Sequence, residues 1–131
     1  MAAQALSDYR RLVVKVGSSL LVADDGQLNR GWLETLVHDV ASLQKACHEI
    51  LIVSSGAISI GSSVIGINKR RARLEDLQAA AASGQVQLVH ADQEVLGAHD
   101  IGAAQVLLTP EDTENRRRFL NARGTLERLL E

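Results

Sequence analysis

Two short apolar runs, each ending in a loop of small residues, constrain the fold of this 131-residue chain most strongly. The first covers residues 12–16 (LVVKV) and ends at 17–19 (GSS), and the second covers 50–53 (ILIV) and ends at 54–57 (SSGA). Nearly continuous apolar runs of this length are typical of strands that are buried on both faces of a parallel sheet. With a helix between them, they predict a right-handed βαβ unit.

Helical patterns separate and follow these strands. Asn29 is placed to cap a helix with one apolar face, made by Leu33, Leu36, Val37, Val40 and Leu43. A short helix is expected over residues 57–65, and a long helical region from Leu74, in which Gly84 marks a break or a close contact. A third strand over residues 103–108 and a final helix over about 111–131 complete the prediction of one α/β unit.

The composition excludes several classes of protein. Aromatic residues make up 2% of the chain, which disfavours modules that stack nucleic-acid bases and leaves a core of Leu, Ile, Val and Ala. The net charge of −2 gives no general attraction to DNA or to an anionic membrane. Cys47 is the single cysteine, so no internal disulfide forms, and we expect a packed thiol. The chain shows neither a signal peptide nor a membrane span, which predicts a soluble cytoplasmic domain.

Chemistry is expected at the loops that follow the first two strands. Ligands of open parallel sheets bind beyond the carboxyl ends of the strands, where small side chains let a ligand approach the backbone. A helix that follows such a loop points N–H groups at an anion. Neither loop is a Walker A motif, and either could contain Gly and Ser only because a tight turn requires them.

Lys15 interrupts the first apolar run. Burial of an unpaired ammonium group would be costly, so this side chain either extends past a short edge of the sheet or faces a cleft that holds an anion. The four histidines have no metal-ligand spacing. Two basic clusters, at residues 69–73 and 116–118, are interpreted as solvated faces because acidic residues lie close to both in the sequence.

Four segments, in order, resemble the glutamate 5-kinases, which belong to the amino acid kinase family. They are residues 13–19 (VVKVGSS), 52–58 (IVSSGAI), 78–85 (QAAAASGQ), and 107–109 with 118–126 (LLT and RFLNARGTL). Together they span nearly all of residues 11–130. Ser83 and Gly124 depart from the residues that are common in the family, and both lie outside the two loops.

The resemblance implies a three-layer αβα sandwich with a mainly parallel sheet. Residues 1–131 would form a partial amino acid kinase domain that holds the substrate and phosphate-loop half and lacks the nucleotide half. The implied reaction is the ATP-dependent phosphorylation of the γ-carboxylate of L-glutamate, with Mg²⁺, as the first step of proline biosynthesis. The isolated chain is expected to be inactive, and it could form a homo-oligomer.

The resemblance also implies roles for individual residues. Lys15 would contact the β- and γ-phosphates of ATP, and the backbone of Gly17 and Ser18 would hold the same phosphates. Ser55 would bind the amino acid, and Gly56 would allow close approach to the backbone. No metal ligand is implied. Two alternatives stay open: a related carboxylate or carbamate kinase, and a non-catalytic fragment that acts as a binding or assembly module.

Overall fold

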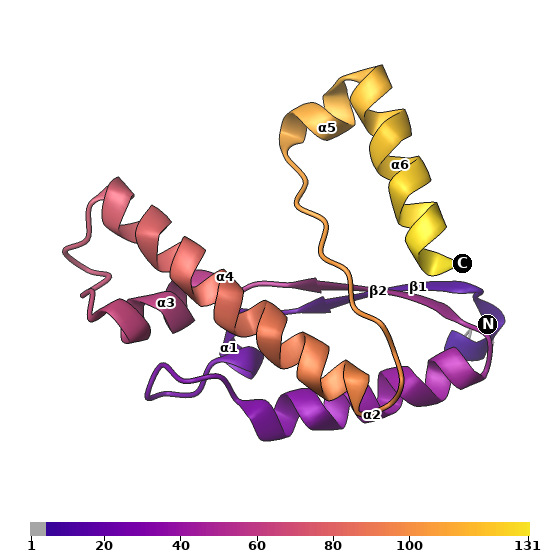
Figure 1. Cartoon of the computed structure of the whole chain (residues 1–131), viewed down its shortest axis with the longest axis horizontal. Coiled ribbons are helices and arrows are strands. Elements are labelled where there is room, and N and C mark those ends of the chain that lie inside the picture. Colours follow the sequence, from indigo (N-terminus) through magenta and orange to yellow (C-terminus); the bar gives the residue numbers. More distant parts are fainter. Residues whose placement is uncertain (1–4) are drawn as a thin grey trace.

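The fold is built on two parallel strands joined by a long helix (Figure 1). The computed structural model describes residues 5–131. Strand β1 (Arg11–Val16) pairs in parallel with β2 (Glu49–Ser54), and helix α2 (Arg30–Lys45) lies between them in the chain. Val16 is paired with Ser54, so both strands end level with each other. This confirms the predicted β-α-β order and brings the two loops to one edge of the sheet.

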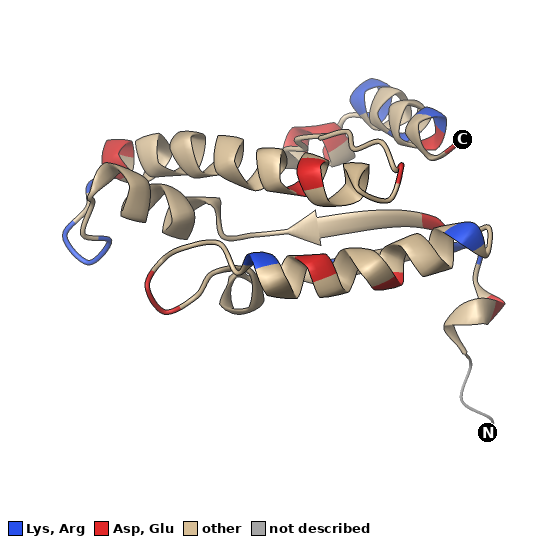
Figure 2. Cartoon of the chain, turned by 60° about the horizontal axis from the view of Figure 1, so that its bottom comes forward, with Lys and Arg blue, Asp and Glu red and all other residues tan. Residues whose placement is uncertain are grey.

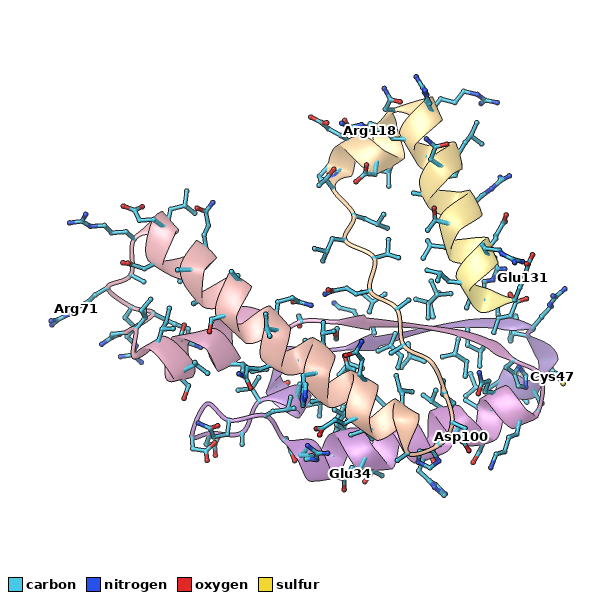
Figure 3. All side chains as sticks on the ribbon, in the orientation of Figure 1. Glu34, Cys47, Arg71, Asp100, Arg118 and Glu131 are labelled. Carbon is cyan, nitrogen blue, oxygen red and sulfur yellow. The ribbon has the colours of Figure 1, made fainter. Side chains whose placement is uncertain are left out.

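Helix α2 begins and faces inward as predicted. The Asn29 side chain accepts a hydrogen bond from the Trp32 N–H at 3.3 Å, which caps the helix. Of the five residues predicted for its apolar face, Leu33, Val37 and Val40 are buried, whereas Leu36 and Leu43 are only partly buried. Ala41, which was not predicted, completes the buried stripe. After the helix, Cys47 adopts a left-handed backbone with φ of 67° and is exposed (Figure 3). The expectation of a packed thiol was wrong, because this residue belongs to the turn that ends the helix rather than to its apolar face.

Helices α3 (Ala57–Ile65) and α4 (Leu74–Gly97) form a hairpin that extends from the sheet (Figure 1). They touch backbone to backbone. A Cβ atom at Gly61 would lie 1.7 Å from the Ala80 carbonyl oxygen, and one at Gly84 would lie 1.8 Å from the Ala57 carbonyl oxygen. Gly84 is therefore a close contact, and α4 continues through it without a break.

One apolar core joins the sheet to four of the helices. Val16 of β1 and Leu21 of α1 (Ser18–Leu21) belong to the same buried cluster as residues of α2, α3 and α4. Those residues are Leu33, Val37, Ile60, Leu88, Ala91 and Val95. The core fixes where β1 ends, and so where the loop after it lies. None of the described helices is long and apolar enough to cross a membrane.

The face of the sheet that points away from the core, called here the uncovered face, is largely exposed. Along β1, Leu12 and Val16 are buried, whereas Val13 is 65% exposed, and in β2 Val53 is 51% exposed. The prediction of strands buried on both faces was therefore wrong: α2 lies on one side of the strands (Figures 1 and 2), and the face that carries Val13 and Val53 stays largely exposed. The class is α/β with a small parallel sheet, as predicted.

The predicted third strand is absent from the described chain. Residues 103–108 run past the sheet without a strand partner (Figure 1), because apolar composition alone does not supply the neighbouring backbone that a strand needs. The predicted final helix is two helices, α5 (Pro110–Glu114) and α6 (Arg116–Leu130). Asn115 separates them, and its side chain accepts hydrogen bonds from the N–H groups of Arg117 and Arg118. At the other end of the chain, η1 (Leu6–Asp8) precedes β1.

Candidate functional site

The loops that follow β1 and β2 lie side by side. The Ser55 N–H donates a hydrogen bond to the Val16 carbonyl oxygen at 3.2 Å, which ties the start of one loop to the end of the other strand. A Cβ atom at Gly56 would lie 3.4 Å from the Ser18 Cβ atom. Four of the five predicted site residues, Gly17, Ser18, Ser55 and Gly56, therefore come from two neighbouring turns at the carboxyl edge of the sheet.

Gly56 holds a conformation that other residues rarely adopt. Its φ is +117°, and a side chain there would also meet the Val22 Cγ2 atom at 3.1 Å. Gly56 is the N-cap of α3, and among the residues that the structure describes no side chain caps this end of the helix. The first N–H groups of a helix have no partner within the helix, so this end carries a partial positive charge and open donors. The arrangement suits an anionic ligand.

Lys15 is the penultimate residue of β1 and lies opposite Val53 in the sheet. Its side chain is exposed on the uncovered face, and within residues 5–131 it has neither an ion-pair nor a hydrogen-bond partner. The ammonium group is therefore not neutralised by a neighbouring carboxylate. It stands one residue from the first loop, where it adds a positive charge to the same edge.

A hollow of about 450 Å³ adjoins the first loop and was not foreseen from the sequence. It lies between the turn at residues 22–26 and one side of α3, and of the predicted site residues only Ser18 lines it. The Lys69 Nζ atom donates a hydrogen bond to the Ser59 hydroxyl at 2.9 Å. Ser62 is 4% exposed, and its hydroxyl has no hydrogen-bond partner within residues 5–131. Serines at 59, 62 and 63 share one face of α3, and this polar stripe was the sequence signal that could have indicated the hollow.

The arginines of the two basic clusters, at residues 69–73 and 116–118, are exposed. Residues 69–73 form the loop at the tip of the α3–α4 hairpin, where Figure 2 shows positive charge, and Arg71 extends outward in Figure 3. At the amino end of the sheet, Glu49 forms ion pairs with Arg10 and Arg11, at 2.8 and 2.7 Å. The hydrogen bond from Arg11 is the main reason that the pKa of Glu49 lies below its ordinary value. These charges compensate each other far from the carboxyl edge.

The residues present suit a nucleotide phosphate better than a metal ion bound by side chains alone. In the part of the chain that the structure describes, no three His, Cys, Asp or Glu side chains are grouped to hold a metal. The edge instead offers N–H groups, small side chains and one unpaired ammonium group. These are groups that hold a polyphosphate, which brings its own Mg²⁺.

Comparisons with known proteins agree with this chemistry. The amino acid kinase family matches residues 10–131. Proteins named glutamate 5-kinase from Brucella ovis, Brucella canis and Brucella melitensis are each 55% identical over 125 residues, which is 95% of this chain and 33% of each relative. The chain thus spans about a third of the length of the curated relatives it matches.

Proposed function

Because this chain belongs to the amino acid kinase family, we propose that it supplies the phosphate-loop and substrate half of a glutamate 5-kinase. The likeness to relatives of that name supports glutamate as the substrate. The observation that carries the proposal is the meeting of two small-residue turns, an uncapped helix end and an unpaired lysine at one edge of the sheet. We also place the protein in the cytoplasm, which cell fractionation tests.

The reaction requires charge control more than proton transfer. The γ-carboxylate of glutamate is ionised at neutral pH, so it needs no general base. One of its oxygens forms a bond to the γ-phosphorus of ATP while the bond from that phosphorus to the β,γ-bridging oxygen breaks, which releases ADP. Both reactants are anions, so the catalyst must hold them in line and stabilise the charge that spreads over the phosphoryl oxygens.

The chain offers a separate group for each of these needs. When bound, Mg²⁺-ATP would supply the phosphoryl group and part of the neutralising charge. The backbone of Gly17 and Ser18 would hold the β- and γ-phosphates, and Lys15 would stabilise the charge on the transferring group. Ser55 would donate a hydrogen bond to the amino acid, which Gly56 lets approach the first turn of α3. A catalytic site that includes the adenine pocket needs more protein than these residues provide, so the chain alone should be inactive.

The test uses a chimaera in which this chain replaces the matching third of the Brucella ovis relative. Glutamyl phosphate is trapped as its hydroxamate, and ATP-dependent product is measured. Lys15→Met should lower kcat by roughly 100- to 1000-fold, as loss of one charge-stabilising donor does. Lys45→Met is the matched control, because Lys45 lies in the last turn of α2, away from the site, and its loss should not change the rate.

Two results would count against the proposal. One is a folded chimaera that makes no hydroxamate from glutamate, and the other is a Lys15→Met variant as fast as the Lys45→Met control. Activity on another carboxylate or on carbamate, but not on glutamate, would reassign the substrate within the family. Ser55→Ala should raise KM for glutamate more than it lowers kcat, since it removes a binding contact.

A further inference from the structure

We propose that the hollow between the turn at residues 22–26 and helix α3 binds a small zwitterion, a molecule with one carboxylate and one ammonium group. The simplest ligand of this class is a neutral α-amino acid. The inference does not depend on the proposed function, because the nucleotide phosphates and glutamate are assigned to the two turns at the edge of the sheet. It is carried by a buried hydroxyl that the described chain leaves unpaired, and by opposite charges that line the same space.

The turn that forms one wall of the hollow is attached to α3. The Gln27 Nε2 atom donates a hydrogen bond to the Ser63 hydroxyl at 3.3 Å, and a Cβ atom at Gly26 would lie 3.0 Å from the Ser63 Cβ atom. The turn is closed by a hydrogen bond from the Ala23 N–H to the Gln27 carbonyl oxygen at 2.8 Å. The volume of about 450 Å³ lies within the range of about 300–1,000 Å³ that small-molecule sites occupy. The hollow therefore has the size and the defined walls of a binding site.

Ser62 supplies a hydroxyl that the fold does not use. It lines the hollow, it is 4% exposed, and among the described residues its Oγ atom has no hydrogen-bond partner. Other hydroxyls in helices of this chain donate to the carbonyl oxygen four residues earlier, as the Ser42 hydroxyl does to His38 at 3.1 Å. Ser62 does not make this bond. Leaving a buried hydroxyl unpaired is unfavourable, so a ligand that accepts a hydrogen bond from it gains affinity.

Lys69 places a positive charge at the same hollow. Its Nζ atom donates a hydrogen bond to the Ser59 hydroxyl at 2.9 Å, and within the described chain no carboxylate pairs with it. An ammonium group has three N–H donors, so two remain for a ligand. Ser59 and Ser62 are three residues apart in α3 and share one face of the helix. Lys69 and these serines therefore suit a carboxylate, to which charged donors form the stronger hydrogen bonds.

The turn supplies the opposite charge. Asp24 and Asp25 line the hollow, and Figure 2 shows the acidic turn and the basic loop that contains Lys69 at the same end of the molecule. Asp25 Oδ1 accepts a hydrogen bond from the Gln27 N–H at 2.9 Å, whereas the Asp24 carboxylate has no partner in the part of the chain that the structure describes.

These charges decide the class of ligand. The two carboxylates of the turn would repel a simple anion, and the Lys69 ammonium group would repel a simple cation. A ligand that carries both charges satisfies both walls. Val22 and Ile67 also line the hollow, which favours a ligand whose remaining atoms are apolar.

The experiment titrates the isotope-labelled chain with L-alanine and follows the amide chemical shifts. The shifts should saturate and should be confined to the residues that line the hollow. Isobutyrate, in which a methyl group replaces the ammonium group of alanine, should bind roughly 10-fold or more weakly. The same loss is expected for isopropylamine, in which a methyl group replaces the carboxylate, because each analogue lacks one charge-assisted contact.

Substitutions assign each charge to its wall. Lys69→Met should weaken L-alanine binding roughly 10-fold or more and abolish the preference for L-alanine over isopropylamine. Asp24→Asn should abolish the preference over isobutyrate instead, and Ser62→Ala should weaken L-alanine binding while circular dichroism shows an unchanged fold. Arg71→Met is the matched control for Lys69→Met, because Arg71 belongs to the same loop, extends outward in Figure 3 and does not line the hollow.

Four results would overturn the proposal. One is the absence of shifts at about 100 mM L-alanine, a hundredfold above a millimolar Kd. Isobutyrate that binds as tightly as L-alanine would make the hollow a site for anions. Shifts at Ser55 and Gly56 alone would place the ligand at the edge of the sheet. Equal weakening by Arg71→Met would indicate a general effect of charge. The hydroxamate assay does not enter this test, so the kinase assignment and the hollow can fail separately.

Discussion

Replacing Gly61 with alanine should force α3 and α4 apart. The added Cβ atom would lie 1.7 Å from the Ala80 carbonyl oxygen, 2.5 Å from the Ala80 carbonyl carbon and 2.8 Å from the Gly84 nitrogen. These are backbone atoms of a helix, so no side chain can rotate out of the way. Real Cβ contacts do not fall below 3.0 Å, so the helices must move by more than an ångström.

The cost of this movement follows from the contacts that it loosens. A radial gap of about 0.5–1 Å already removes a quarter to a half of the dispersion energy of each atom pair. Overpacking of a tight interface costs about 1–3 kcal/mol or more, and the contact at Gly61 is severe enough to place it at the upper end. Alanine recovers about 1 kcal/mol through its higher helix propensity. We therefore expect a net loss of about 2–3 kcal/mol in the free energy of unfolding.

Urea denaturation followed by far-ultraviolet circular dichroism measures this change. Gly31→Ala is the matched control, since Gly31 lies in α2 and a Cβ atom there would meet nothing within 4 Å. That control should be unchanged or more stable by up to about 1 kcal/mol. Gly84→Ala should behave as Gly61→Ala does, because its Cβ atom would lie 1.8 Å from the Ala57 carbonyl oxygen. A Gly61→Ala protein within about 0.5 kcal/mol of the parent would refute the close helix contact.

Three further changes can be measured in the same way. Burial raises the pKa of Asp92 from 3.8 to about 6. The free energy of unfolding should therefore fall as the pH rises from 4 to 6, because the unfolded chain loses a proton in this range that the folded chain keeps. Asp92→Asn should remove this fall and stabilise the protein at pH 7 by about 1–2 kcal/mol, a value reduced because the side chain is only partly buried; an unchanged pH profile would contradict this. Cys47→Gly should add about 0.5–1 kcal/mol, since φ is 67° there, and a loss would contradict the turn geometry. Asn29→Ala should cost about 1 kcal/mol through loss of the hydrogen bond from the Trp32 N–H, and no cost would mean that the cap is replaced by water.

Local patterns were sufficient for the elements that depend on neighbours in the sequence. The spacing of apolar residues located α2, and Asn29 located its start. Helix α3 covers residues 57–65 as expected, and Gly66, with φ of 70°, closes it. The two strands were found because each is a short apolar run between turn residues. Their common carboxyl edge follows from the parallel order, which is why the two loops could be expected to meet.

Elements that depend on distant partners were not predictable in the same way. Residues 103–108 have the composition of a strand, but a strand exists only where another backbone accepts its hydrogen bonds. The hollow beside Ser18 was missed because it forms between the serines of α3 and the turn at residues 22–26. The sequence does not show that these two segments face each other. The division between α5 and α6, in contrast, has a local signal. Asn115 is a residue type that caps helices, and it could have been recognised as the start of α6 from the sequence.

The backbone angle at Gly56 affects how any mutational scan of this chain should be interpreted. With φ of +117° and the Val22 and Ser18 side chains close by, every L-residue at this position meets strain before a ligand is considered. Intolerance to substitution there would therefore measure the shape of the turn and would reveal nothing about recognition. Evidence for an anion at this turn must come from a probe that keeps the glycine, such as amide chemical shifts during titration with a nucleotide.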